Sequence, residues 1–283
     1  MKIQVNDAEL YFDIAGAGLV PDGETMREKP TLILLHGGPG ADHSLFKPGY
    51  DALTDVAQIV YLDHRGNGRS EDCGPETWNL AQWGDDVRGL CDALGIEKPI
   101  VCGVSFGGFV AQSYATRHPD HIGKLILTST AARFEFEKMF DAFEACGGAE
   151  ARAAAEGYWL TPTSESRAHY GKTCLPYYWA RSDGLPDWAP RVLMKDDVAI
   201  WFNGAGNEQG RMDFRADLAR LSCPVLVMAG ENDPVTPVAF SETIAAHLTN
   251  APTQFERFAN CGHGVVEDAG ADALAVLRAF ITN

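Results

Sequence analysis

The chain has 283 residues and a mass of 30.7 kDa, which suits one large domain or two small ones and allows a full hydrophobic core. Hydrophobic residues make up 46% and charged residues 22%, which excludes a disordered or fibrous protein. The formal charge of −16 disfavours nucleic acid and anionic membrane as partners.

Strands and helices are predicted to alternate along the chain. Alternating or continuous apolar segments predict strands at residues 2–5, 9–14, 31–35, 59–62, 99–104, 122–127, 224–229 and 254–258. Apolar residues at helical spacing predict helices over residues 80–94, with Asn79 as N-cap, and over 106–117, 237–248 and 271–281. This order predicts the α/β class, with a doubly wound and mostly parallel sheet.

Residues 133–215 interrupt that alternation. They lack clear strand patterns and hold 14 of the chain's 28 aromatic residues. We predict a helical cap here, inserted into a core domain made of residues 1–132 and 216–283.

The cysteines and the apolar runs bear on the protein's compartment. Seven cysteines without a CxxC pair predict reduced thiols, not a disulfide framework. The run at residues 32–35 is far too short to span a membrane, and residues 1–4 lack the apolar core of a secretion signal. We therefore expect a cytoplasmic protein, and the oligomeric state stays open.

A GxSxG element surrounds Ser105, between a predicted strand and a predicted helix. A sharp strand-to-helix turn exposes the serine hydroxyl, and Gly103 and Gly107 remove side chains that would clash there. The sequence therefore predicts Ser105 as a nucleophile. A plain tight turn is the alternative reading of the small residues.

A nucleophilic serine needs a base and an orienting acid, which follow it in the order acid, then histidine. His263 lies after the last predicted strand with a glycine on each side, which predicts the base. Asp233 follows the strand at residues 224–229 and is the predicted acid, with Glu231 as a weaker candidate. A turn before Pro234 would also explain Asp233.

The glycine-rich loop at residues 36–40 follows another predicted strand. Its backbone amides are suited to an oxyanion, and the amides of Gly38 and Phe106 are the predicted donors. The polar loop at residues 63–68 is predicted to brace it from below. The sequence has no Walker A, GxGxxG or HExxH motif and no metal-spaced His/Cys cluster, so we expect neither a cofactor nor a metal.

Taken together, these motifs resemble the α/β-hydrolase superfamily and, within it, most closely the proline iminopeptidase group. The resemblance covers nearly the whole chain and rests on His36-Gly37-Gly38-Pro39-Gly40, Asp63-His64-Arg65-Gly66-Asn67-Gly68-Arg69-Ser70, Gly103-Val104-Ser105-Phe106-Gly107-Gly108, Asp233-Pro234 and Gly262-His263. It implies an eight-stranded sheet with a helical lid between the sixth and seventh strands. It also implies a triad of Ser105, Asp233 and His263, with Gly38 and Phe106 at the oxyanion.

The sequence departs from that group where it would hold a substrate amine. Phe106 replaces the usual tryptophan after the nucleophile, Glu208 could match one acidic group of the amine clamp, and Pro234 occupies the place of the second. We therefore expect a serine hydrolase that cleaves a small ester, lactone or amide, with proline iminopeptidase as the alternative. A ligand receptor or a non-hydrolytic enzyme on the same fold is a further possibility. The candidate substrate contacts are Gly37, Glu208, Trp201 and Phe202.

Overall fold

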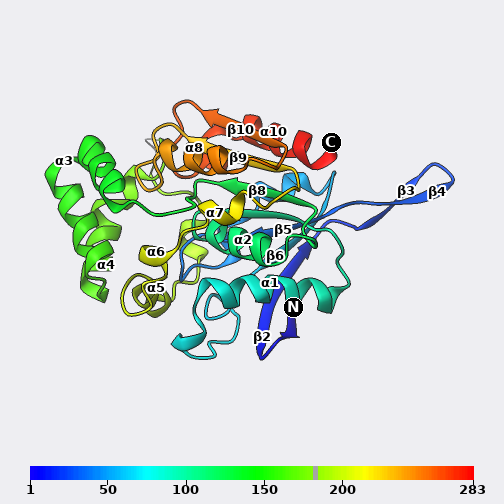
Figure 1. The fold of residues 1–283 in the computed structure, drawn as a ribbon, viewed down its shortest axis with the longest axis horizontal. Coiled ribbons are helices and arrows are strands. Elements are labelled where there is room, and N and C mark those ends of the chain that lie inside the picture. Colours follow the sequence, from blue (N-terminus) through cyan, green and yellow to red (C-terminus); the bar gives the residue numbers. More distant parts are fainter. Residues whose placement is uncertain (181–183) are drawn as a thin grey trace.

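An eight-stranded sheet forms the centre of the molecule (Figure 1). The structure is a computed structural model that describes residues 1–180 and 184–283. In spatial order the strands are β1 (Lys2–Val5), β2 (Ala8–Ala15), β6 (Gln58–Leu62), β5 (Thr31–Leu35), β7 (Ile100–Val104), β8 (Lys124–Thr128), β9 (Val225–Gly230) and β10 (Thr253–Phe258). The strands from β6 to β10 are parallel, whereas β1 and β2 pair in antiparallel fashion. The predicted α/β class and mostly parallel sheet are confirmed.

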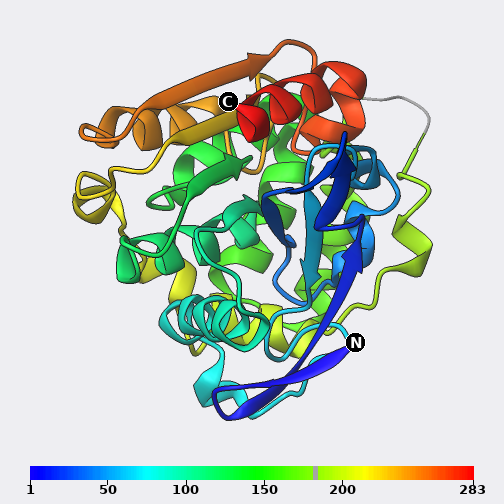
Figure 2. The ribbon, with the colours of Figure 1, turned by 90° about the vertical axis from the view of Figure 1, so that its right-hand side faces the viewer.

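Both faces of the sheet are buried. Alternate residues of its central strands point to opposite sides and therefore enter two different apolar clusters. In β5, Ile33 and Leu35 belong to one apolar cluster, and Leu32 and Leu34 belong to the other. The first face is covered by α1 (Leu80–Leu94), α2 (Phe106–Arg117) and α8 (Val238–His247). The second is covered by η1 (His43–Phe46), η2 (Gly49–Leu53), α9 (Val265–Ala269) and α10 (Ala271–Thr282). Figure 2 shows the two edges of the sheet, β1 and β2 in dark blue and β10 in orange.

Most predicted element boundaries are correct to within two residues. Asn79 caps α1 as predicted, because its Oδ1 accepts a hydrogen bond from the amide of Gln82 at 2.9 Å. The start of β8 moves from Ile122 to Lys124, since the chain is still turning at Gly123, whose amide donates to the Pro99 carbonyl at 2.9 Å. Short 3-10 turns also occur at η3 (Pro75–Thr77), η4 (Leu175–Tyr177) and η5 (Ala189–Arg191).

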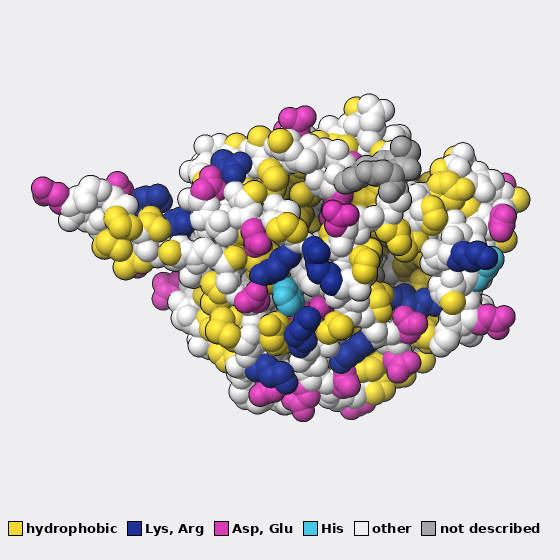
Figure 3. All heavy atoms as spheres, turned by 180° about the vertical axis from the view of Figure 1, so that it is seen from behind, with side chains coloured by type: hydrophobic (Ala, Val, Ile, Leu, Met, Phe, Trp, Pro, Cys, Tyr) yellow, Lys and Arg dark blue, Asp and Glu magenta, His cyan; other side chains and the backbone are white. Residues whose placement is uncertain are grey.

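The hairpin of β3 (Leu19–Asp22) and β4 (Thr25–Glu28) was not predicted. It projects away from the body of the molecule (Figures 1 and 3). Leu19 and Met26 are more than half exposed on it, at 52% and 54%. The strands are only four residues long, and a proline lies in one of them, so the sequence gives little strand signal.

Helices occupy the interval between β8 and β9, the sixth and seventh strands of the sheet. They are α3 (Phe136–Leu160), α4 (Ser164–Thr173), α5 (Asp196–Asn203), α6 (Glu208–Arg211) and α7 (Arg215–Leu218). The described residues of 133–215, called the cap below, contain no strand apart from an isolated bridge between Arg133 and Asp213. That bridge joins the two ends of the cap where it leaves the sheet. No helix in the described part of the chain is long and apolar enough to cross a membrane.

Candidate active site

Ser105 occupies the turn between β7 and α2. Its backbone has φ 56° and ψ −120°, a conformation that residues with side chains rarely adopt. The two glycines of the motif make the turn possible by close approach: a side chain at Gly103 would meet the backbone of Gly107, and one at Gly107 would meet the Leu35 carbonyl. The glycines of the GxSxG element are therefore required by close backbone contacts, as predicted. Ser105 lies at the N-terminal end of α2.

Hydrogen bonds to two threonines hold the strained backbone of Ser105. Its amide donates to the Thr128 carbonyl at 3.0 Å, and Thr130 Oγ1 donates to the Ser105 carbonyl at 2.8 Å. Thr128 is the last residue of β8, the neighbouring strand, and Thr130 lies two residues beyond it. The positive end of the α2 dipole also points at this position, which favours negative charge beside the serine.

Asp233 and His263 are in direct contact. Asp233 follows β9, His263 follows β10, and His263 Nδ1 lies 2.8 Å from Asp233 Oδ2. Among the described residues, no hydrogen bond joins Ser105 Oγ to His263; such contacts are often long before substrate binds. The structure therefore brings the predicted acid and the predicted base into contact, and it places Ser105 after β7 at the same carboxyl edge of the sheet.

The carboxylate of Asp233 is held by its own turn. Its Oδ1 accepts from the amides of Val235 and Thr236 at 2.8 and 2.9 Å, and its Oδ2 accepts from Thr236 Oγ1 at 2.7 Å. Burial alone would raise the pKa of Asp233, but the charge of His263 and the hydrogen bonds from His263 and Thr236 outweigh it and lower the pKa. The group is therefore an anion that can orient and stabilise an imidazolium.

The glycine loop after β5 lies beside Ser105. A side chain at Gly37 would lie 3.4 Å from Ser105 Cβ, and Gly38 has a φ of 124° that favours glycine. Among the described residues, no acceptor hydrogen-bonds to the amides of Gly38 or Phe106. Both predicted oxyanion donors are therefore available.

His36 fixes this loop from within. Its Nδ1 lies 2.8 Å from the Gly37 carbonyl, and its Nε2 accepts the amide of His64 at 3.3 Å, so Nδ1 carries the proton. Burial lowers the pKa of His36, which keeps the ring neutral.

The loop after β6 supports the glycine loop, as predicted. Asn67 Oδ1 accepts the amide of Gly40 at 2.6 Å. Asp63 is fully buried and accepts from the amides of His43 and Arg69, both at 2.9 Å. These contacts join the two loops directly and assign Asp63 to a supporting role.

A buried ion pair anchors this loop to α1. Arg65 and Asp86 have side chains that are 0% and 2% exposed, and two guanidinium nitrogens contact the carboxylate at 2.8 Å each. Asp7 accepts from the same guanidinium at 2.7 Å, but its own side chain is 71% exposed. Because the partners are charged and enclosed, this contact is a rigid fixed point under the site.

The amide of Phe106 is a predicted oxyanion donor, whereas its ring packs in the core. The ring packs edge-to-face against His64, Trp83 and Phe202, with centroids 5.4, 5.0 and 5.3 Å away. Phe202 is fully buried in this aromatic cluster, so it supports Phe106 and is not open to a substrate. Trp201, its neighbour, is only half-buried and packs beside Gly206.

The carboxylate of Glu208, the candidate clamp residue, already has partners in this structure. Its Oε2 accepts the amide of Leu80 at 2.9 Å, which caps the N-terminus of α1, and its Oε1 pairs with Arg211. The side chain is 7% exposed, and both oxygens are engaged. An ammonium group would have to compete with these contacts.

Sequence reasoning missed two residues that contact the pair of Asp233 and His263. Thr236 holds Asp233, as described above. Tyr178, in the cap, accepts the His263 amide at its carbonyl at 2.6 Å, and its ring lies edge-on to the imidazole at 5.2 Å. Thr236 follows Asp233 by three residues and could have been found as a turn partner. Tyr178 carries no such local signal, because it is far from His263 in the sequence.

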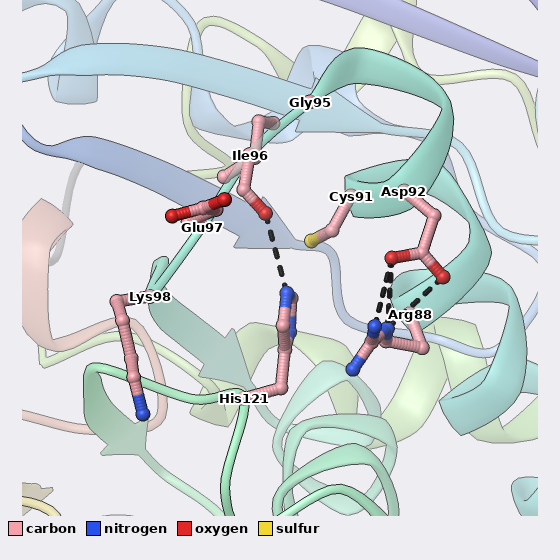
Figure 4. A pocket seen from close by; sticks show the side chains of 8 residues that line it. All are labelled: Arg88, Cys91, Asp92, Gly95, Ile96, Glu97, Lys98 and His121. Atoms are coloured by element: carbon pink, nitrogen blue, oxygen red, sulfur yellow. Dashed lines mark hydrogen bonds and ion pairs between the residues drawn. The ribbon is translucent and has the colours of Figure 1, made fainter.

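Two other features are not part of the contacts around Ser105, Asp233 and His263. Figure 4 shows a hollow of about 430 Å³ near the amino ends of β7 and β8, where Arg88 pairs with Asp92 and His121 reaches the Ile96 carbonyl. Asp42, His43 and Asp63 bring ligand-type atoms within 4.8 Å of one another. Their carboxylates already accept hydrogen bonds from His43, Ser44 and Arg69, which accounts for the cluster as an ion-pair network.

Comparison with known proteins gives relatives of several activities. A Caulobacter protein (strain K31) named as a carbamate hydrolase, RutD, is 28% identical over 278 residues, with 96% of each chain covered. The proline iminopeptidase of Lactobacillus crispatus is 27% identical over 293 residues, covering 96% of this chain and 94% of that protein. The crystal structure of the enol-lactonase from Burkholderia xenovorans LB400 aligns over the full length of both chains, with a TM-score of 0.72 and 24% identity.

The family model of the alpha/beta hydrolase fold matches residues 30–269. This span includes β5 to β10 and every residue of the predicted triad. The two relatives named above from sequence comparison are both named as hydrolases, in agreement with the observed sheet order and the strand-to-helix turn at Ser105. The chain therefore belongs to the α/β-hydrolase family and is a hydrolase.

Proposed function

We propose that the protein is a serine hydrolase that cleaves a small carboxylic ester, lactone or amide through an acyl-enzyme. The observation that carries the proposal is the strained turn at Ser105 together with the contact of 2.8 Å between Asp233 and His263, at the same edge of the sheet. A strained serine, a buried acid–base pair and two unpaired amides are the parts that acyl transfer requires.

Each of these parts has a role in the reaction. Ser105 Oγ attacks the carbonyl carbon while His263 Nε2 takes the hydroxyl proton, and Asp233 stabilises the resulting imidazolium. The amides of Gly38 and Phe106 bind the oxyanion. As the bond to the leaving group breaks, His263 returns the proton to that group. Water then adds to the acyl carbon and gives a proton to His263. As the bond to Ser105 Oγ breaks, His263 returns that proton to the serine oxygen, and the acid is released.

The cap supports an apolar acyl or leaving group. Its aromatic residues pack on one another, with ring centroids 5.1 Å apart for Tyr158 and Tyr170 and 5.8 Å for Phe143 and Tyr170. Tyr178 carries this aromatic layer to the imidazole. Phe143, Tyr158 and Tyr170 are buried within the cap, so Tyr178, which is partly exposed, is the ring of this layer that a substrate could contact.

A burst experiment tests the proposal. Mixing the protein with a p-nitrophenyl ester should release about one equivalent of p-nitrophenol rapidly, followed by slower turnover. Prior treatment with a serine-directed phosphonate should abolish both phases. A protein that binds the ester without releasing p-nitrophenol would be a receptor, and the proposal would be wrong.

Release of N-terminal proline is the second candidate, supported by the relative from Lactobacillus crispatus. It requires carboxylates for the substrate ammonium, and Glu208 is already bound to Leu80 and Arg211. We therefore expect simple esters to be turned over at least as well as prolyl-anilide. A kcat/KM for prolyl-anilide that exceeds that of esters by about 100-fold, and collapses in Glu208→Gln, would favour the iminopeptidase instead.

A further inference from the structure

The cap and the loop that carries His263 are joined by a set of contacts that we call the latch. The latch consists of residues 178–180 of the cap and residues 262–268 of the core. Within it, the Tyr178 carbonyl accepts the amides of His263 and Gly264 at 2.6 and 3.4 Å. A side chain at Gly262 would lie 2.5 Å from that same carbonyl oxygen, so the glycine permits the close approach of the cap.

Asp268 bonds to both sides of the latch. One carboxylate oxygen, Oδ2, accepts the amide of Gly262 at 2.7 Å and the amide of Ala180 at 2.9 Å. Gly262 immediately precedes His263, whereas Ala180 belongs to the cap. The neighbouring carboxylate, Glu267, adds a second link, because its Oε1 accepts Trp188 Nε1 at 3.2 Å.

The backbone of His263 is thus fixed by the cap as well as by the sheet. Asp233 holds the imidazole through Nδ1, but the placement of Nε2 also depends on where the residue's backbone lies. A displacement of about 1 Å at a reacting group can cost about 100-fold in rate. The contacts of Asp268 therefore help to set where His263 Nε2 lies.

We propose that Asp268 is a positioning residue that fixes His263 against the cap. It acts by accepting the two amides and not through its charge. This inference rests on the proposed function, since it gives His263 the role of general base.

Two substitutions separate the hydrogen bonds from the charge. Asp268→Asn keeps an oxygen that can accept both amides and removes the charge, whereas Asp268→Ala removes both. We expect Asp268→Ala to lower kcat for a p-nitrophenyl ester by about 10- to 100-fold, with KM changed less than about threefold. The rate of phosphonate labelling of Ser105 should fall in parallel. Asp268→Asn should stay within about threefold of the wild type in both measurements.

A matched control removes a charge elsewhere. Asp55→Ala breaks an exposed pair with Arg278 and should leave kcat and the labelling rate unchanged. Melting temperatures identify any variant that is unfolded at the assay temperature. If Asp268→Ala does not fold, Asp268→Ser replaces it, because the serine side chain is too short to reach both amides.

Two results would overturn the proposal. Unchanged kcat in Asp268→Ala would show that the bonds do not position the base, and an equal loss in Asp268→Asn and Asp268→Ala would show that charge is what matters. Failure of the proposed function looks different, because the phosphonate would then fail to label Ser105 in the wild-type protein.

Discussion

The loops at the carboxyl edge of the sheet and the cap above them are held by different kinds of contact. In the loops, single polar groups meet specific backbone atoms, as Asn67 does with Gly40 and Asp63 with His43. In the cap, aromatic rings pack on one another, as Tyr170 does with Phe143 and Trp159. Polar contacts are directional, whereas apolar packing accepts many arrangements of similar volume. Chemistry is therefore expected to depend on the loops, and substrate choice on the cap.

Loss of the nucleophile or the base should have the largest effect. Ser105→Ala and His263→Ala should each lower kcat by about 10⁴-fold or more, because the members of a triad act as a unit. The double variant should be little worse than either single one. Stopped-flow ester hydrolysis measures the loss. A kcat in Ser105→Ala similar to that of the wild type would contradict the acyl-enzyme mechanism.

Asp233→Asn should lower kcat by about 10⁴-fold, because an amide favours the wrong imidazole tautomer. Glu231→Gln is the matched control and should be nearly neutral, since Glu231 is exposed and Asp233 makes the contact with His263. A larger loss in Glu231→Gln than in Asp233→Asn would exchange the two assignments.

The pair of Arg65 and Asp86 tests the rigidity of the loops. Asp86→Ala should lower the free energy of unfolding by about 3–5 kcal/mol, because it leaves a buried guanidinium poorly paired. Asp7→Ala removes the exposed partner and should cost at most about 1 kcal/mol. Urea unfolding of both variants measures the difference. Equal losses would mean that burial does not set the strength of this fixed point.

Exchange of the cap should change selectivity more than chemistry. Replacing residues 133–215 by the cap of another hydrolase should alter the ranking of esters, lactones and anilides. The ends of the segment are already adjacent through Arg133 and Asp213, which favours the exchange. Phosphonate labelling of Ser105 should persist, although more slowly if the latch is lost. An unchanged substrate ranking would contradict the role given to the cap.

Glu267, on the core side of the latch, should have the smallest effect. Burial raises the pKa of Glu267, and the hydrogen bond from Trp188 offsets only part of this. A raised folded pKa favours the protonated form, so its contribution to stability is present at acid pH and is lost as the pH rises through that pKa. Glu267→Gln should therefore raise the melting temperature more at pH 8 than at pH 5, relative to the wild type. A larger increase in melting temperature at pH 5 than at pH 8 would mean that the pKa of Glu267 is lowered, not raised.

The same distinction explains what could be predicted from the sequence. The strands from β5 to β10 and the Ser105 turn were predictable, because buried parallel strands and glycine-dependent turns each leave a local pattern. The hairpin of β3 and β4 was missed, since its short strands have no buried face. Glu208 was a candidate substrate contact on its motif alone, and its hydrogen bond to the Leu80 amide at the start of α1 had no signal in the sequence. The contact between Tyr178 and His263 joins distant segments and leaves no local pattern.

The central claim is that Ser105 forms the acyl-enzyme, and peptide mapping after phosphonate treatment tests it most directly. The account predicts one adduct, on the peptide that contains Ser105, with loss of esterase activity in proportion to labelling and much slower labelling in His263→Ala. Full esterase activity in a protein labelled at Ser105, or full loss of activity with the adduct on another residue, would contradict it.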